Sequence, residues 1–141
     1  MRVQSAEFER SFAKAADCPE DAVPEIAFIG RSNVGKSSLL NLLTRQKKLA
    51  RVSQTPGCTQ LINFFKVNGA CRFVDLPGYG YAAVPREAKL RWQQVMANYL
   101  VSRENLKGVV LLCDPRHGLT ELDEVLLEVI RPRVEEGLKF L

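Results

Sequence analysis

Short apolar runs separated by polar, turn-rich segments predict alternating strands and helices along the chain. Residues 25–29 (EIAFI) and 109–113 (VVLLC) are continuous and apolar, which is typical of buried parallel strands. The stretch INFFKV-NG-ACRFVDL (62–76) contains two strand-like runs around Asn68-Gly69. Both turn residues tolerate positive φ, so this stretch predicts a hairpin.

Helical patterns follow the first strand, the hairpin and the second buried strand. Residues 38–44 are rich in leucine, and a capping-box-like segment at Thr120–Asp123 opens a helix that Pro132 is expected to end or kink. The helix predicted from Arg86 onward has apolar residues at helical spacing: Ala88, Trp92, Val95, Met96, Tyr99 and Leu100. The inward positions of the last helix are Leu122, Val125, Leu126, Val129 and Ile130.

The order of these elements predicts an α/β fold with a mostly parallel sheet, to which the hairpin adds one antiparallel edge. Residues 1–24 are expected to form an N-terminal extension that packs on a domain spanning residues 25–141. Within the extension, residues 5–16 have two phenylalanines four positions apart and predict a short amphipathic helix. Leu138–Leu141 resembles the start of another strand, so the domain is expected to be incomplete at its C-terminus.

The composition is that of a folded soluble domain, with 46% hydrophobic and 26% charged residues among 141. It excludes a disordered tail and a coiled-coil rod. No stretch approaches the ~20 apolar residues of a membrane helix, and the N-terminus lacks the apolar core of a signal peptide. The four cysteines form no CxxC pair, which argues against a zinc site and a disulfide framework. A cytoplasmic protein with no membrane partner is expected.

Positive charge is concentrated in the middle of the chain. The net charge is +4, yet residues 25–60 carry +5 and residues 61–107 carry +4, while both ends are acidic. Such a concentration favours phosphates or nucleic acid as partners, and a solvated basic face is the alternative. The basic run at residues 45–51 either contacts RNA phosphates or keeps a loop hydrated.

The strongest motif is Gly30–Ser37 (GRSNVGKS), a complete GxxxxGK[ST] phosphate-binding loop between an apolar strand and a leucine-rich helix. Its glycines allow tight backbone conformations close to phosphate oxygens, and the following helix N-terminus adds partial positive charge. Lys36 is expected to reach the β- and γ-phosphates, and the hydroxyl of Ser37 is expected to ligate Mg²⁺.

A second motif, Asp75-Leu76-Pro77-Gly78, follows the hairpin 38 residues after Ser37. An aspartate at the end of a buried strand can hold Mg²⁺ through water, and the Gly78 N–H can sense a γ-phosphate. Alone, a DxxG string is also a common strand-ending turn. Between the two motifs, a hydroxyl in residues 53–60 can complete the Mg²⁺ shell, and Ser53, Thr55 and Thr59 compete for this role. A polar surface loop is the alternative reading of this segment.

The chain resembles the TRAFAC class of GTPases and, within it, the EngB family of ribosome-biogenesis GTP-binding proteins. The strings that carry the resemblance are GRSNVGKSSLLN (30–41), TPGCTQLINFF (55–65), DLPGYGYA (75–82) and DPRHGLTELD (114–123). The resemblance implies a Ras-like P-loop GTPase fold, a three-layer sandwich. It also implies a Mg²⁺-dependent GTPase switch that acts in assembly of the large ribosomal subunit, with division and septation defects when it is lost.

The resemblance further assigns site residues. Thr59 becomes the switch I threonine, residues 75–85 become switch II, and Mg²⁺ is bound by Ser37, Thr59 and, through water, Asp75. The implied nucleotide-binding residues are Gly30, Arg31, Ser32, Asn33, Val34, Gly35, Lys36, Ser37, Ser38, Gly57, Cys58, Thr59, Gln60, Leu61, Asp75, Leu76, Pro77 and Gly78. In related GTPases an asparagine at the position of Asn33 ligates K⁺, and a polar filler or cap is the alternative role.

Three features depart from the patterns of this class. Cys58 stands where the family usually has a basic residue, and Tyr79 stands where Ras-like enzymes have the glutamine that orients water. No TKAD or NKxD string, which reads guanine, occurs in the chain, so a partial form of the family domain is expected. No catalytic residue can be named from the sequence.

The expected partners are GTP or GDP and a ribosomal large-subunit precursor with its RNA, bound by a protein that is monomeric when complete. Two alternatives remain open: a non-hydrolysing nucleotide- or RNA-binding module, and another P-loop NTPase that uses ATP. A partial chain without GTPase activity would belong to the first of these. No adenine-specific feature supports use of ATP, and the sequence of residues 55–82 argues against it.

Overall fold

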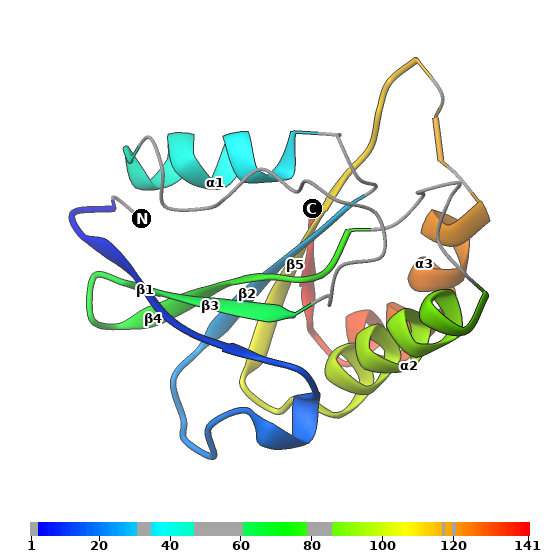
Figure 1. The fold of residues 1–141 in the computed structure, drawn as a ribbon, viewed down its shortest axis with the longest axis horizontal. Helices are drawn as coiled ribbons and strands as arrows, with labels where there is room; N and C mark the ends of the chain where they lie inside the picture. The colour runs from blue at the N-terminus through cyan, green and yellow to red at the C-terminus, as the bar shows by residue number, and fades with distance from the viewer. Residues whose placement is uncertain (1–2, 31–34, 47–60, 79–85, 117, 120) are drawn as a thin grey trace.

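The computed structural model describes residues 3–30, 35–46, 61–78, 86–116, 118–119 and 121–141. Its helices are α1 (Lys36–Thr44), α2 (Arg86–Ser102) and α3 (Glu121–Glu135), with a short 3-10 turn at Ala15–Asp17. Its strands are β1 (Ala6–Phe12), β2 (Glu25–Gly30), β3 (Ile62–Val67), β4 (Cys71–Asp75), β5 (Leu106–Leu112) and β6 (Lys139–Phe140). Figure 1 shows their arrangement.

The six strands form one sheet in the order β1-β3-β4-β2-β5-β6. β2 pairs in parallel with both β4 and β5, and β5 pairs in parallel with β6. β3 and β4 form the predicted hairpin, and Asn68 and Gly69 both have positive φ at its turn. The sequence-based prediction of a mostly parallel sheet with an antiparallel edge is therefore confirmed.

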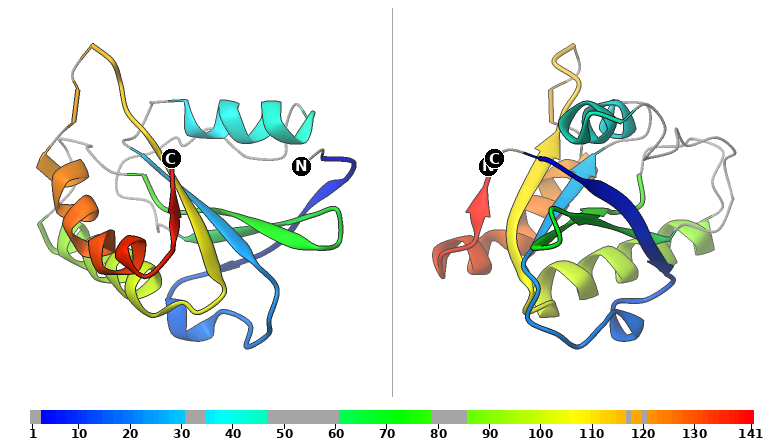
Figure 2. Two further views of the ribbon diagram at one scale, coloured as in Figure 1. Left: turned by 180° about the vertical axis from the view of Figure 1, so that it is seen from behind. Right: turned by 90° about the vertical axis from the view of Figure 1, so that its left-hand side faces the viewer.

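Helices cover both faces of the sheet, which gives the predicted three layers. α1 lies on one face, and α2 and α3 lie side by side on the other (Figures 1 and 2). The core beneath α2 and α3 is the larger one and includes the buried side chains of Trp92, Met96, Tyr99, Leu100, Leu126 and Ile130. The α1 side has its own cluster, centred on Leu40, Phe28, Phe65 and Phe73. The period of the apolar positions thus identified the inner face of α2.

The predicted N-terminal helix is wrong, because residues 6–12 form the edge strand β1. β1 pairs antiparallel with β3, with a register irregularity between Phe8 and Arg10. The outer edge of β3 needs backbone partners, and a strand supplies them where a helix cannot. Two edge-to-face ring contacts add to this pairing: Phe8 with Phe65, and Phe12 with Phe64.

α3 also departs from its prediction. Pro132 lies inside the helix, which continues to Glu135, so this proline does not end it. Val125 was expected to point inward but is 48% exposed, whereas Leu126 and Ile130 are buried as expected. None of the helices in the described part of the chain is long and apolar enough to cross a membrane.

Candidate phosphate-binding site

The start of α1 has the local geometry that a phosphate-binding loop requires. β2 ends at Gly30, and α1 begins at Lys36 after the N-cap Gly35. Gly35 adopts φ +98°, a left-handed conformation that favours glycine, although a Cβ there would meet no atom within 4 Å. This N-cap makes no side-chain hydrogen bond to the first turn of α1. Because glycine has no side chain, Gly35 leaves the N–H groups of the first turn uncapped, and a helix N-terminus of this kind is suited to an anion.

Lys36 reaches across from α1 to the end of β4. Its ammonium lies 2.8 Å from Asp75 Oδ1, and it also donates a hydrogen bond to the Leu76 carbonyl. Both ionic side chains are largely buried, at 12% and 11% exposure. Asp75 pairs with Phe28 in the sheet register, so it sits at the same strand end from which the phosphate loop leaves. Folding therefore joins Lys36 of the first motif to Leu76 of the second, which is 40 residues later in the sequence.

Asp75 and Ser37 carry the kinds of oxygen atom that bind magnesium. Apart from the Lys36 ion pair, Asp75 Oδ1 is buried and receives no hydrogen bond from the residues that the structure describes. A carboxylate oxygen and a hydroxyl are the hard oxygen ligands that Mg²⁺ accepts, and Mg²⁺ retains several waters. Ser37 is partly buried in the first turn of α1, next to Lys36.

The segment after Asp75 is held at three successive points. The Leu76 N–H donates to the Phe28 carbonyl on β2 at 3.2 Å, and its carbonyl accepts from Lys36. The indole N–H of Trp92, on α2, donates to the Pro77 carbonyl at 2.8 Å. The backbone leading to Gly78 is thereby attached to β2, α1 and α2.

Several predicted site residues lie outside the described residues, namely Arg31, Ser32, Asn33, Val34, Gly57, Cys58, Thr59, Gln60 and Tyr79. The proposed K⁺ ligand Asn33 and the switch I hydroxyls, Thr59 among them, belong to this group. Leu61 and Gly78 are described and partly buried, at the two ends of the described stretch 61–78. The structure brings Lys36 together with Asp75 and Leu76, and Gly35 and Ser37 are the sequence neighbours of Lys36 at the start of α1.

Sequence reasoning missed a buried ionic network at the opposite end of the sheet. Glu25, the first residue of β2, has a fully buried side chain that accepts hydrogen bonds from Arg72, Arg103 and Tyr99. The guanidinium carbons of Arg72 and Arg103 lie 5.2 and 5.6 Å from the ring centroid of Phe64. A charge of each sign inside otherwise apolar strands, as in EIAFI and CRFVD, was the available signal.

The network also fastens the N-terminal segment to the domain. Arg72 pairs with Glu9 on β1 at 3.2 Å and with Asp21 at 2.6 Å. The hydrogen bond from Arg72 lowers the pKa of Asp21 from 3.8 to about 2, and burial opposes this shift only in part. Burial raises the pKa of the nearby Cys18 thiol to about 11.

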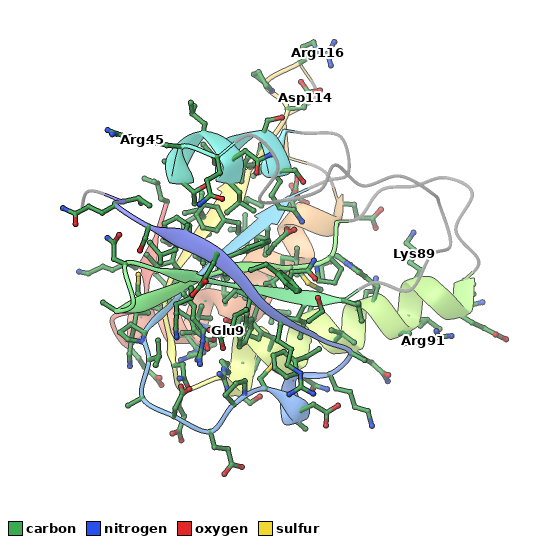
Figure 3. All side chains as sticks on the ribbon, turned by 60° about the vertical axis from the view of Figure 1, so that its left-hand side comes forward. Glu9, Arg45, Lys89, Arg91, Asp114 and Arg116 are labelled. Carbon is green, nitrogen blue, oxygen red and sulfur yellow. The ribbon has the colours of Figure 1, made fainter. Side chains whose placement is uncertain are left out.

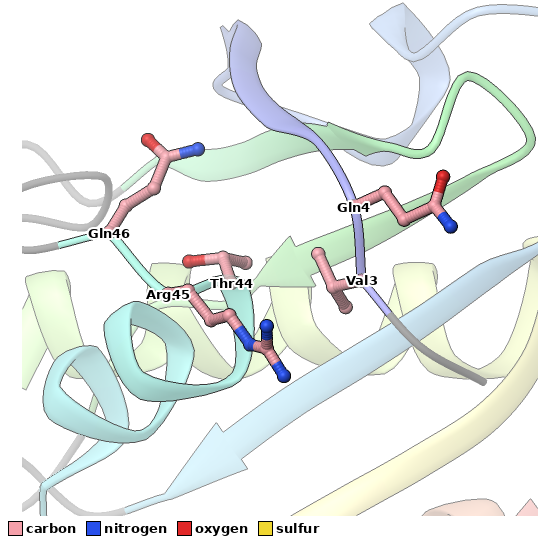
Figure 4. A pocket seen from close by; sticks show the side chains of 5 residues that line it. All are labelled: Val3, Gln4, Thr44, Arg45 and Gln46. Carbon is pink, nitrogen blue, oxygen red and sulfur yellow. The ribbon is translucent and has the colours of Figure 1, made fainter.

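Two other features lie away from the phosphate loop. A hollow of about 510 Å³ is lined by Val3, Gln4, Thr44, Arg45 and Gln46, at the end of α1 remote from Lys36 (Figure 4). The exposed Arg116 pairs with the partly buried Asp114, with 2.9 Å between Nη2 and Oδ2, at the tip of the loop that projects after β5 (Figure 3).

A phosphate loop on a three-layer α/β sheet, with its lysine meeting the aspartate at the next strand end, defines a P-loop nucleotide-binding domain. Residues 25–138 match the family described as 50S ribosome-binding GTPase. The chain belongs to this family and, by its relatives, to the EngB family of GTP-binding proteins.

The similarity to individual relatives is high. A probable GTP-binding protein EngB of Albidiferax ferrireducens is 68% identical over 123 residues, which cover 84% of this chain and 59% of the relative. Its counterpart from Polaromonas sp. is 62% identical over 143 residues, covering 99% and 58%. The chain thus spans about three fifths of the length of these relatives. The crystal structure of a probable GTP-binding protein engB, 23% identical, shares the fold with a TM-score of 0.62 over 83% of this chain and 66% of that one.

Proposed function

We propose that this protein is a Mg²⁺-dependent GTPase switch that acts on the large ribosomal subunit. The observation that carries the proposal is the meeting of Lys36 and Asp75 at adjoining strand ends, behind a complete GxxxxGKS loop. Membership of the 50S ribosome-binding GTPase family supports GTP as the nucleotide and the ribosome as the partner.

The residues of this site divide the work of binding a triphosphate. The backbone at Gly35 and the first turn of α1 receive phosphate oxygens. Lys36 leaves its ion pair with Asp75 and contacts the β- and γ-phosphates instead. Ser37 directly, and Asp75 through water, would hold Mg²⁺. That ion, when bound, neutralises charge that develops on the phosphate oxygens. The Gly78 N–H, which follows the anchored Pro77 carbonyl, would sense the γ-phosphate.

Residues outside the described part of the chain complete the proposal. Thr59 would join the Mg²⁺ shell only when the γ-phosphate is present, and Asn33 would ligate K⁺. Tyr79, in place of a water-orienting glutamine, agrees with slow intrinsic hydrolysis that needs stimulation. The proposed setting is a cytoplasmic protein needed for ribosome assembly and normal division.

The basic residues that follow α1 are the proposed contacts to ribosomal RNA. Arg45 is exposed beside the α1 C-terminus, and Lys47, Lys48 and Arg51 follow it in sequence. Each phosphate that they neutralise releases counterions, so association should weaken steeply with salt. Replacing Lys47 and Lys48 with Gln is expected to flatten that dependence, and an unchanged slope would assign these lysines to solvent.

Two measurements separate the proposed function from its alternatives. Competition of GTP, GDP and ADP for the same site distinguishes a GTP-binding protein from a general P-loop NTPase. Multiple-turnover release of phosphate, with and without ribosomal subunits, distinguishes a GTPase from a non-hydrolysing module. Because no TKAD or NKxD string occurs in these 141 residues, similar and weak affinities for GDP and ADP are expected of this chain, with turnover stimulated by ribosomal subunits. Strong selectivity of this chain for GDP would contradict the guanine-reading role assigned to that string.

A further inference from the structure

α2 is attached to the rest of the domain by two buried hydrogen bonds at opposite ends of one helix face. Trp92 Nε1 donates to the Pro77 carbonyl at 2.8 Å, and Tyr99 Oη donates to Glu25 Oε1 at 2.7 Å. The two residues are seven positions apart, which places them on the same side of the helix. The Trp92 bond meets the nucleotide end of the sheet, and the Tyr99 bond meets the opposite end.

The hydrogen bond from Trp92 holds the backbone segment that leads to the proposed γ-phosphate contact. Pro77 immediately precedes Gly78, whose N–H is the proposed sensor of the γ-phosphate. The carbonyl of Leu76, one residue earlier, accepts a hydrogen bond from Lys36. This contact must change when Lys36 binds phosphate. The bond to Trp92 involves neither Lys36 nor Asp75 and can persist through that change.

We propose that Trp92 is a positioning residue that fixes the Pro77 carbonyl, and with it the Gly78 N–H, in the orientation that recognises a γ-phosphate. The same bond makes α2 follow this segment when the triphosphate binds or is lost. Trp92 is 6% exposed and packs in the core beneath α2, so a displacement of Pro77 is passed to the helix rather than absorbed by solvent. This inference rests on the proposed nucleotide site.

The direct test uses two conservative variants of the same helix. Trp92→Phe keeps an aromatic ring in the core and removes the indole donor. Tyr99→Phe is the matched control, because it removes a buried donor on the same face, far from Pro77. Affinities for Mg²⁺–GDP and for a non-hydrolysable Mg²⁺–GTP analogue are measured on the 141-residue chain. Thermal unfolding of both variants records the purely structural cost.

Trp92→Phe is expected to weaken binding of the GTP analogue by about threefold to tenfold, the worth of one hydrogen bond, with GDP affinity within about twofold. Tyr99→Phe is expected to lower the melting temperature without changing the ratio of the two affinities. A ratio unchanged in Trp92→Phe, or changed equally in both variants, would overturn the positioning role. Wild-type protein that binds neither nucleotide would instead refute the proposed function and, with it, this inference.

A second readout needs no substitution. Trp92 is the only tryptophan in the chain, so selectively excited indole fluorescence reports on this one site. Different emission spectra for the GDP and GTP-analogue complexes are expected, because the carbonyl acceptor moves relative to the indole. Identical spectra at saturation by both nucleotides would contradict coupling between Gly78 and α2.

Discussion

Lys36 Nζ lies 2.8 Å from Asp75 Oδ1, so the cation proposed for phosphate and the carboxylate proposed for Mg²⁺ neutralise each other across two layers of the fold. Phosphate oxygens must therefore compete with Asp75 for the ammonium. Mg²⁺ in turn must compete with the ammonium for Asp75. A nucleotide that binds Lys36 frees Asp75 for Mg²⁺, and Mg²⁺ that binds Asp75 frees Lys36 for the nucleotide. The two binding reactions are therefore linked thermodynamically.

This relationship predicts opposite effects of Asp75→Asn under two conditions. With Mg²⁺ chelated, the variant is expected to bind nucleotide more tightly than wild type, because Lys36 no longer has an anionic partner. With Mg²⁺ present, it is expected to bind about tenfold more weakly, the scale of one charged hydrogen bond. Titrations in Mg²⁺ and in chelator measure both. Asp114→Asn, shortly after the end of β5, is the control. Equal weakening of nucleotide binding by Asp75→Asn in chelator and in Mg²⁺ would contradict the linkage.

A different prediction concerns the stability of the fold. Arg103→Ala is expected to lower the free energy of unfolding by about 3 kcal/mol, because it leaves the fully buried Glu25 carboxylate with one guanidinium fewer. Denaturant unfolding measures the change. Arg116→Ala removes an ion pair whose arginine is 82% exposed and serves as the control with little expected effect. Equally small decreases in the free energy of unfolding of both variants would show that the Glu25 network is dispensable for stability.

Asp21 predicts how stability depends on acidity. Its pKa is lowered from 3.8 to about 2 in the folded protein, chiefly by the hydrogen bond from Arg72. The resulting stabilisation is present above the unfolded pKa and is lost as pH falls through about 4 toward 2. Because the side chain is about one third exposed, solvent weakens the effect.

Unfolding measured across that pH range tests the prediction. Asp21→Asn is expected to reduce the slope of stability against pH relative to wild type. Glu20→Gln, a change at the neighbouring exposed carboxyl, is the control. A wild-type slope in Asp21→Asn would show that the Arg72 contact does not persist in solution.

The sequence predicted those elements whose signals are local. The hairpin rests on Asn68-Gly69, and the inner face of α2 rests on a clear helical period. β1 was mistaken for a helix because its phenylalanines, four apart, fit both periods, and only the unpaired edge of β3 decides between them. Pro132 was expected to end or kink α3, and it does not end the helix, which continues to Glu135.

The candidate site likewise has a part that local sequence predicts and a part that it does not. The string GRSNVGKS identified the phosphate loop because backbone geometry dictates its glycines. The Trp92–Pro77 bond and the Glu25 network join residues 15 and up to 78 positions apart, and no local pattern encodes such pairs. Three-dimensional packing alone brings these groups together.

The central claim is that Lys36 carries phosphate recognition in a GTP-binding site. Equilibrium titration of a fluorescent GTP analogue, with Mg²⁺, into wild type and Lys36→Ala tests it most directly, with circular dichroism to confirm unchanged helix content. We predict saturable binding to wild type and loss of binding in Lys36→Ala, because the ammonium that meets the β- and γ-phosphates is gone. Equal affinity of the two proteins, at equal helix content, would contradict the assignment of the phosphate loop.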